Sequence, residues 1–190
     1  MIGRGLAPVA GCAAAPWAGR LAGLAAAVLL AACATAPSPE PSQAEAAWTS
    51  GRLALRVEAQ AGQPARQMTA SFDLRGSAHA GELRLLSPLG TLAARTVWGP
   101  GRVELSTPEG ARTFDDLDTL SREALGEVLP LRALPDWLAG RPWSAVQSLP
   151  RDGGFHQLGW DVDTAAFADG LLVARREAPP AVTLRVRLER

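Results

Sequence analysis

A period-two alternation of apolar and polar residues recurs along this chain, and it constrains the fold more than any other feature of the sequence. Because successive side chains of a strand point to opposite faces, this pattern predicts half-buried antiparallel strands. It occurs in residues 52–58, 67–75, 82–85, 102–105, 157–163 and 182–189, and turn-forming glycines and prolines separate these segments. In the segment 157–163, the expected inward residues are Leu158, Trp160 and Val162.

Residues 115–139 break this pattern, because their apolar residues fall at helical spacing. Asp115, Asp116 and Ser121 are the expected caps of a first helix, which Pro130 ends. A short second helix is expected to open at Pro135 and to close at Gly140. Strands, a helical pair and strands again predict one sheet whose concave face the helices cover.

Residues 1–32 form a separate segment with two arginines, no acidic residue and an apolar run from Leu21 to Ala32. A basic start, an apolar stretch and small residues at its end are typical of a signal peptide. A membrane-spanning anchor is the alternative, but the run is well short of the roughly 20 residues that a spanning helix needs. We therefore expect residues 1–32 to be removed.

The residues that close the apolar run, Leu30-Ala31-Ala32-Cys33, resemble the lipobox that lipoprotein signal peptidase cleaves. An ordinary signal peptide followed by a stray cysteine is the alternative. The lipobox predicts that Cys33 becomes the lipidated N-terminus. Ala34 follows it in place of the aspartate that retains lipoproteins at the inner membrane. The expected location is therefore the outer membrane, with the chain lipid-anchored and facing the periplasm.

Cleavage before Cys33 leaves one domain's length of chain, with 19 acidic residues, 17 arginines and a net charge of −2. This balance excludes a nucleic-acid binder that relies on bulk positive charge. Residues 33–47 are rich in Pro, Ala and Ser and are expected to form a flexible tether. The folded domain is expected over residues 48–190. Cys12 leaves with the signal peptide, so the domain has no disulfide and depends on its apolar core.

Residues that could carry out catalysis or bind a metal are scarce in the mature chain. His79 and His156 are expected to be solvated loop residues. The acidic cluster around Asp116 is explained by capping, because a helix N-terminus favours negative charge. The sequence has no metal-ligand spacing, phosphate-binding glycine loop or nucleophile motif. We expect no enzymatic activity, no metal and no cofactor.

The segment Ser87-Pro88-Leu89-Gly90 fits a type I turn, with serine first, proline second and glycine fourth. Leu89 then lies at the tip, where a polar residue is the usual choice. An exposed leucine forgoes roughly 1.5–3 kcal/mol of burial. Leu89 therefore either folds back on the core or meets an apolar partner, and the residues alone leave both open.

The tryptophans of the mature chain have two interpretations. Aromatic residues on strands that face a helical cover normally pack in a core, and they can equally line a cavity that a small helical plug leaves unfilled. Periodicity does not distinguish the two. These residues are Trp48, Trp98, Trp137, Trp143 and Trp160.

Seven short segments follow one another between Trp48 and Arg190. They are Trp48 with the nearby GRLALRV, then SFDLRG, GELRLLSPLGTLAA, VWGPG, LPLRALPDWLAGRP, LGWDV and VTLRVRLER. Together they resemble the family of the outer-membrane lipoprotein receptor LolB over essentially the whole mature domain. The chain departs from the family pattern at its C-terminus, which stops soon after the last segment.

The resemblance implies a mainly β (α+β) fold: an incomplete, curved antiparallel β-barrel whose short helices plug the concave face around an apolar cavity. The family accepts acylated lipoproteins from a soluble periplasmic carrier, the related LolA, and inserts them into the outer membrane without a cofactor. In the family, the leucine of the Pro-Leu-Gly turn protrudes and is needed for delivery to the membrane. This assigns a membrane insertion loop to Pro88, Leu89 and Gly90. The residues expected to line the acyl cavity are Leu55, Phe72, Leu85, Trp98, Trp137, Leu138 and Trp160.

The expected partners are a LolA-like carrier, acylated lipoprotein cargo and outer-membrane lipid. The chain is expected to be a monomer that binds no nucleic acid. One alternative is a passive lipid-binding or structural envelope lipoprotein without a transfer role. Another is a periplasmic hydrolase, which requires a polar cluster on the concave face. The predicted strands place Leu, Val, Trp and Met there, which disfavours the hydrolase.

Overall fold

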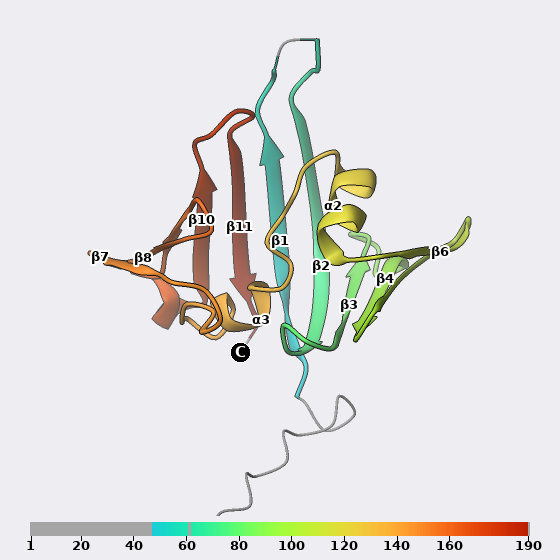
Figure 1. The fold of residues 1–190 in the computed structure, drawn as a ribbon, viewed down its shortest axis with the longest axis horizontal. Coiled ribbons are helices and arrows are strands. Elements are labelled where there is room, and N and C mark those ends of the chain that lie inside the picture. The colour runs from blue at the N-terminus through green and yellow to red at the C-terminus, as the bar shows by residue number, and fades with distance from the viewer. Residues whose placement is uncertain (1–46, 61, 190) are drawn as a thin grey trace, which may run out of the picture. The chain divides into compact units, whose positions relative to one another are not determined.

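A computed structural model describes residues 47–60 and 62–189 of the chain. Cys33, the expected signal peptide and nearly all of the expected tether lie outside the described residues. Within them, eleven strands form one antiparallel sheet in the order β6-β5-β4-β3-β2-β1-β11-β10-β9-β8-β7. The sheet is open and curved, with its two end strands unpaired with each other (Figure 1). The expected mainly β fold with an incomplete, curved antiparallel barrel is confirmed.

The elements are short, and each strand pairs with its neighbours in antiparallel register. The helical elements are α2 (Leu117–Leu125), α3 (Leu134–Trp137) and the 3-10 helix η2 (Phe167–Asp169). The strands are β1 (Thr49–Val57), β2 (Arg66–Gly76), β3 (Gly81–Leu86), β4 (Leu92–Gly99), β5 (Arg102–Thr107), β6 (Gly110–Phe114), β7 (Leu149–Arg151), β8 (Gly154–Gln157), β9 (Trp160–Asp163), β10 (Leu171–Arg176) and β11 (Val182–Leu188).

The alternation of the sequence becomes the two faces of this sheet. Leu55 of β1 pairs with Met68 of β2 on one side and with Leu184 of β11 on the other. Their side chains share one face, which α2 and α3 overlie in Figure 1. The arginines that alternate with them, such as Arg185 and Arg187, are exposed on the opposite face. The helices therefore cover the apolar face of the sheet, as predicted.

The first helix begins as the sequence predicts but ends earlier. The Asp116 side chain accepts a hydrogen bond of 2.6 Å from the backbone N–H of Thr119, which lowers the pKa of this carboxyl group. The helix ends at Gly126, whose φ of +76° is left-handed, and not at Pro130. Glycine adopts this conformation without a Cβ clash, so it stops the helix before proline is reached. Ser121 was expected as a cap but lies inside the helix, where its hydroxyl accepts from the N–H of Leu129.

The alternation misplaces Leu158. In the structure, Leu158 and Gly159 form the turn between β8 and β9, and the strand resumes only at Trp160. The Leu158 side chain is exposed, whereas Gln157 is buried in its place. Because a two-residue turn interrupts the alternation of the strand here, Leu158 lies at the tip of a hairpin and not on the inward face.

The core contains three of the five tryptophans. Trp98, Trp137 and Trp160 are buried, and the Trp137 ring contacts Phe155 and Trp160 edge to face at 6.2 and 6.3 Å between centroids. Trp143 packs against this core from a half-buried position. The core interpretation is wrong for Trp48, which is 37% exposed and lies under two guanidinium groups. These groups belong to Arg75 and Arg84, at 4.5 and 4.3 Å from the ring centroid.

A buried carboxylate lies on the outer face of the sheet. Glu82 of β3 is 3% exposed and accepts hydrogen bonds of 2.8, 2.9 and 2.6 Å from Arg75, Arg84 and Arg95. The hydrogen bond from Arg95 contributes most to lowering the pKa of Glu82 to about 2, against the opposing effect of burial. The three arginines stabilise the ionised form of this group, whereas burial alone would raise its pKa.

Acid should therefore weaken the fold through Glu82. A carboxyl group whose pKa is lower in the folded chain stabilises the fold above its unfolded value of about 4.5, and this contribution is lost as pH falls toward 2. We expect about 2–3 kcal/mol of the free energy of unfolding to disappear over that window, after allowance for the partly exposed arginines. Urea unfolding of wild type and Glu82→Gln at pH 7 and pH 3 measures it. The difference between the two proteins should shrink at pH 3, and a constant difference would contradict this.

Candidate functional site

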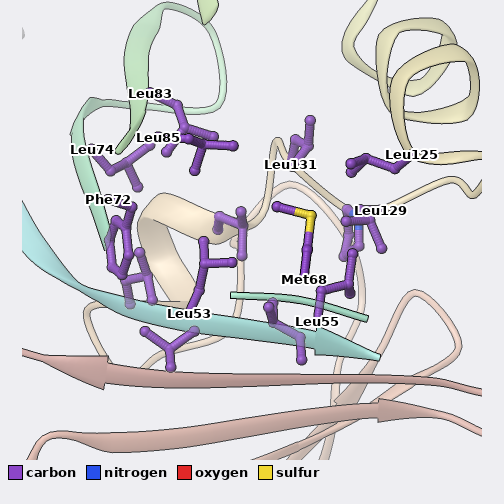
Figure 2. Close-up of a pocket in the computed structure, with 15 residues that line it drawn as sticks. Leu53, Leu55, Met68, Phe72, Leu74, Leu83, Leu85, Leu125, Leu129 and Leu131 are labelled. Carbon is purple, nitrogen blue, oxygen red and sulfur yellow. The ribbon is translucent and has the colours of Figure 1, made fainter. Parts of the chain in front are cut away.

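An apolar cavity lies between the concave face of the sheet and the helical segment that covers it. Its volume is about 60 Å³, and none of its fifteen lining residues has an ionisable or nucleophilic side chain. Figure 2 shows the side chains of Leu53, Leu55 and Met68 pointing from the sheet toward Leu125 and Leu131 of the cover. The sheet contributes Leu53, Leu55, Met68, Phe72, Leu74, Leu83, Leu85, Leu184 and Val186, and the cover contributes Leu125, Leu129, Pro130, Leu131, Leu134 and Leu138.

The cover runs from the end of α2 through residues 126–133 into α3, and it is mostly irregular backbone. Arg176 of β10 binds residues 126–133 of the cover through its side chain, and Trp137 of α3 donates a hydrogen bond of 2.9 Å to the side chain of Gln157 on β8. One guanidinium nitrogen lies 2.7 Å from the Glu127 carboxylate, and the other donates to the Val128 carbonyl oxygen at 3.3 Å. Both side chains of this ion pair are largely buried. Residues 126–133 therefore rest on apolar packing and on the attachment to Arg176, which makes this part of the cover easier to displace than a strand of the sheet.

The predicted cavity residues divide into two groups. Leu55, Phe72, Leu85 and Leu138 line the cavity. The three tryptophans assigned to the lining, Trp98, Trp137 and Trp160, are instead in the closely packed core and do not border it. Aromatic rings fill space efficiently, so they leave no cavity where they meet.

Sequence reasoning missed most of the leucines in the cover and on the neighbouring strands. Leu53, Met68, Leu83 and Leu134 are only partly buried, although they belong to the apolar face. The signal for the strand residues was present, because each alternates with polar neighbours on β1, β2 or β3. The segment opposite the sheet decides whether an apolar residue borders the cavity or packs against an aromatic ring. The alternation along a strand contains no information about that segment.

The turn that carries Leu89 is built as the sequence predicts. The N–H of Gly90 donates to the carbonyl oxygen of Ser87 at 2.9 Å, and the Ser87 hydroxyl accepts from the N–H groups of Leu89 and Thr91, both at 3.3 Å. Gly90 has a φ of +80°, which completes the reversal between β3 and β4. Leu89 is 93% exposed. Of the two possibilities left open, the structure eliminates folding back on the core.

The polar residues that could support other chemistry are scattered. His79 is exposed in the β2–β3 turn, as expected. His156 was expected in a loop but lies on β8, where its Nδ1 is 2.9 Å from the Asp161 carboxylate across the β8–β9 hairpin. Among residues 47–60 and 62–189, no group of three or more His, Cys, Asp or Glu side chains could hold a metal ion. No helix in this part of the chain is long and apolar enough to cross a membrane.

Comparison with known proteins adds an independent line of information. A family model described as "Outer membrane lipoprotein LolB" matches residues 46–189. The outer-membrane lipoprotein LolB of Bordetella petrii is 35% identical over 163 residues, covering 80% of this chain and 81% of the relative. The proteins of the same name from Chromobacterium violaceum and Alkalilimnicola ehrlichii are 33% and 37% identical over 150 and 163 residues. Each covers 75% of this chain, and the aligned regions span 80% and 78% of those relatives.

Proposed function

This chain belongs to the LolB family of outer-membrane lipoproteins, and from that premise we propose that it accepts acylated lipoproteins from a soluble periplasmic carrier and inserts them into the outer membrane. The exclusively apolar cavity under a displaceable cover is the observation that carries the proposal. The transfer needs no covalent chemistry, cofactor or metal, and we propose that the chain acts as a monomer on a LolA-like carrier, its acylated cargo and outer-membrane lipid.

The energetics of acyl chains explain why such a protein needs an apolar cavity. Moving each CH₂ group of an acyl chain out of water gains about 0.8 kcal/mol, so a lipoprotein does not leave a membrane or cross water unaided. A carrier must offer a comparably apolar site, and a receptor must offer a slightly better one. Transfer then proceeds by differential affinity without an external energy source.

Cargo binding requires the cavity to widen. Pockets for small ligands usually measure about 300–1,000 Å³, whereas this one has a volume of about 60 Å³. The sheet is held by continuous ladders of backbone hydrogen bonds, whereas residues 126–133 of the cover are held by apolar contacts and by Arg176. We therefore place the movement in residues 126–133. Acyl chains would replace the leucines of the cover as partners for the leucines of the sheet.

Delivery to the membrane is assigned to the exposed Leu89, and anchoring to Cys33. Leu89 follows the end of β3, and the register places Leu86 of β3 level with Arg52, near the start of β1. Fourteen residues separate Cys33 from Trp48, and extended they can reach about 50 Å. The nine residues of β1 rise only about 30 Å. The tether is therefore long enough for Leu89 and a lipidated Cys33 to reach the same membrane.

A transfer assay with purified components tests the proposal. The mature chain with Cys33→Ala is mixed with a lipoprotein held by its soluble carrier, and the proteins are then separated by affinity capture. We expect the cargo to move to this chain, because its apolar cavity competes for the acyl chains. A passive envelope lipoprotein predicts that the cargo stays with the carrier, and that outcome would reject the receptor function.

A further inference from the structure

Leu158 occupies the first position of the two-residue β8–β9 turn, in a backbone conformation that leucine rarely adopts. The φ angle is +55° at Leu158 and +77° at Gly159, and Gln157 pairs with Trp160 across the turn. Positive φ at both turn residues is typical of a type I′ turn, in which Asn-Gly is strongly preferred. In the left-handed region, the Cβ of leucine crowds the following carbonyl oxygen, so this residue is strained where asparagine is tolerated.

The same side chain is also exposed to solvent. Leu158 is 43% exposed, although the residues on both sides of its turn, Gln157 and Trp160, are 1% and 2% exposed. The base of the hairpin is thus anchored in the core, and its tip holds an apolar side chain outward. A residue that is both strained and exposed contributes little to folding, and strain that persists in a well-packed structure points to a functional role.

The β8–β9 turn lies at the same edge of the sheet as the Leu89 turn. Neighbouring strands alternate in direction, so β1, β3, β8 and β10 all run toward this edge, although Leu86 of β3 is level with Arg52 of β1 and His156 of β8 is level with Arg56. Both leucines follow strands of this set. Four strands, β2, β1, β11 and β10, separate β3 from β9. At about 4.8 Å per strand, β3 and β9 are roughly 24 Å apart across the curved sheet.

We propose that Leu158 is a second apolar contact with the lipid surface, which together with Leu89 holds this edge of the sheet against the bilayer. The proposal rests on the proposed function of the chain. A single contact lets the domain pivot, whereas two separated contacts fix an axis and keep the sheet face between them in a constant orientation. That face includes the inward side chains of β1, β2 and β11 that line the cavity.

Single leucines on rigid tips suit a bilayer better than a protein partner. A stable protein interface needs a continuous patch of roughly 800 Å² on each side. Isolated apolar side chains on turns can instead enter the boundary between headgroups and acyl chains without a complementary surface. A contact with the carrier at Leu158 is therefore treated as a competing outcome of the test.

The test uses the lipidated mature chain in vesicles of phosphatidylethanolamine and phosphatidylglycerol, with cargo supplied on the soluble carrier. Leu158→Asn should raise the melting temperature by about 2–4 °C, because asparagine relieves the strain. It should leave cargo acceptance unchanged and slow insertion by about tenfold, the loss expected for partial burial of one leucine. Leu158→Met should insert cargo at the wild-type rate. Asp152→Asn, in the β7–β8 turn at the opposite edge, is the matched polar control and should change nothing.

A direct measurement of whether position 158 enters the bilayer tests this proposal separately from the function on which it rests. Leu158→Cys and Asp152→Cys are each labelled with an environment-sensitive fluorophore, since the two native cysteines are Cys12 and Cys33. Emission at position 158 should shift to the blue on vesicles, and emission at 152 should not. Unshifted emission at 158, wild-type insertion by Leu158→Asn, or its loss of acceptance from the carrier would each overturn the proposal. Failure of the wild-type chain to accept any cargo would instead reject the proposed function, and the fluorophore would still report on the contact.

Discussion

Leu89→Glu is expected to insert lipoproteins about a hundredfold more slowly than wild type, or slower still, while folding and cargo binding remain normal. Leu89 is 93% exposed and supports no part of the core, so the substitution should leave the melting temperature nearly unchanged. A leucine entering the bilayer gains roughly 1.5–3 kcal/mol, and a carboxylate in its place must either stay in water or lose its hydration. Both effects oppose contact between the turn and the membrane.

The measurement is cargo transfer from the receptor to vesicles, with acceptance from the carrier measured separately. Pro100→Glu introduces the same charge in an exposed turn at the opposite edge of the sheet and should insert cargo normally. Leu89→Met keeps an apolar tip and should retain most of the activity. Wild-type insertion by Leu89→Glu would show that this turn does not act at the membrane.

Gln157→Leu is expected to lower the free energy of unfolding by about 3–5 kcal/mol, a large part of the total for a domain of this size. The Gln157 carboxamide oxygen accepts from Trp137 Nε1 and from the Trp143 N–H, both at 2.9 Å. Its nitrogen donates to the carbonyl oxygens of Trp143 and Val146, both at 2.8 Å. Leucine fills a similar volume but leaves these groups unpaired in or near the core, where each costs about 1–3 kcal/mol.

Urea unfolding at neutral pH provides the comparison. Gln147→Leu replaces an exposed glutamine on the same connection between α3 and β7, and it should change stability by no more than about 0.5 kcal/mol. If Gln157→Leu were as stable as wild type, the hydrogen bonds of Gln157 would not be holding the α3–β7 connection in place. Because Gln157 also forms the base of the Leu158 turn, the two residues should be changed separately.

Strands with one solvent-exposed face could be predicted from the alternation of apolar and polar residues. Strands that are buried on both faces could not. β1, β2 and β11 follow their alternation closely. β10 contains the continuous apolar run Leu172–Ala174, all buried, and such a run does not by itself distinguish a strand from a helix. β4 was missed because its inward residues include Thr96, a polar residue that is buried here.

The sequence predicted the apolar character of the candidate site better than it predicted which residues line the cavity. Leu89 could be placed at a turn tip because Ser87, Pro88 and Gly90 specify the turn locally. The apolar face could be assigned from periodicity, and four of the seven expected residues do line the cavity. The position of Trp48 could not be predicted from periodicity, because its ring lies against Arg75 and Arg84 of two other strands. Contacts between distant segments decide such positions.

The sequence by itself determined the sheet, the helical cover and the turn that carries Leu89, because the strand pleat, the helix period and turn chemistry act between residues that are close along the chain. It also predicts a lipobox at Cys33, which lies outside the described residues. Only the tertiary structure decided that leucines and not tryptophans border the cavity, and that Arg176 fastens the cover. It likewise turned Leu158 from an expected core residue into an exposed hairpin tip. These outcomes depend on which segments meet across the sheet, and packing between distant residues is not encoded in a local pattern.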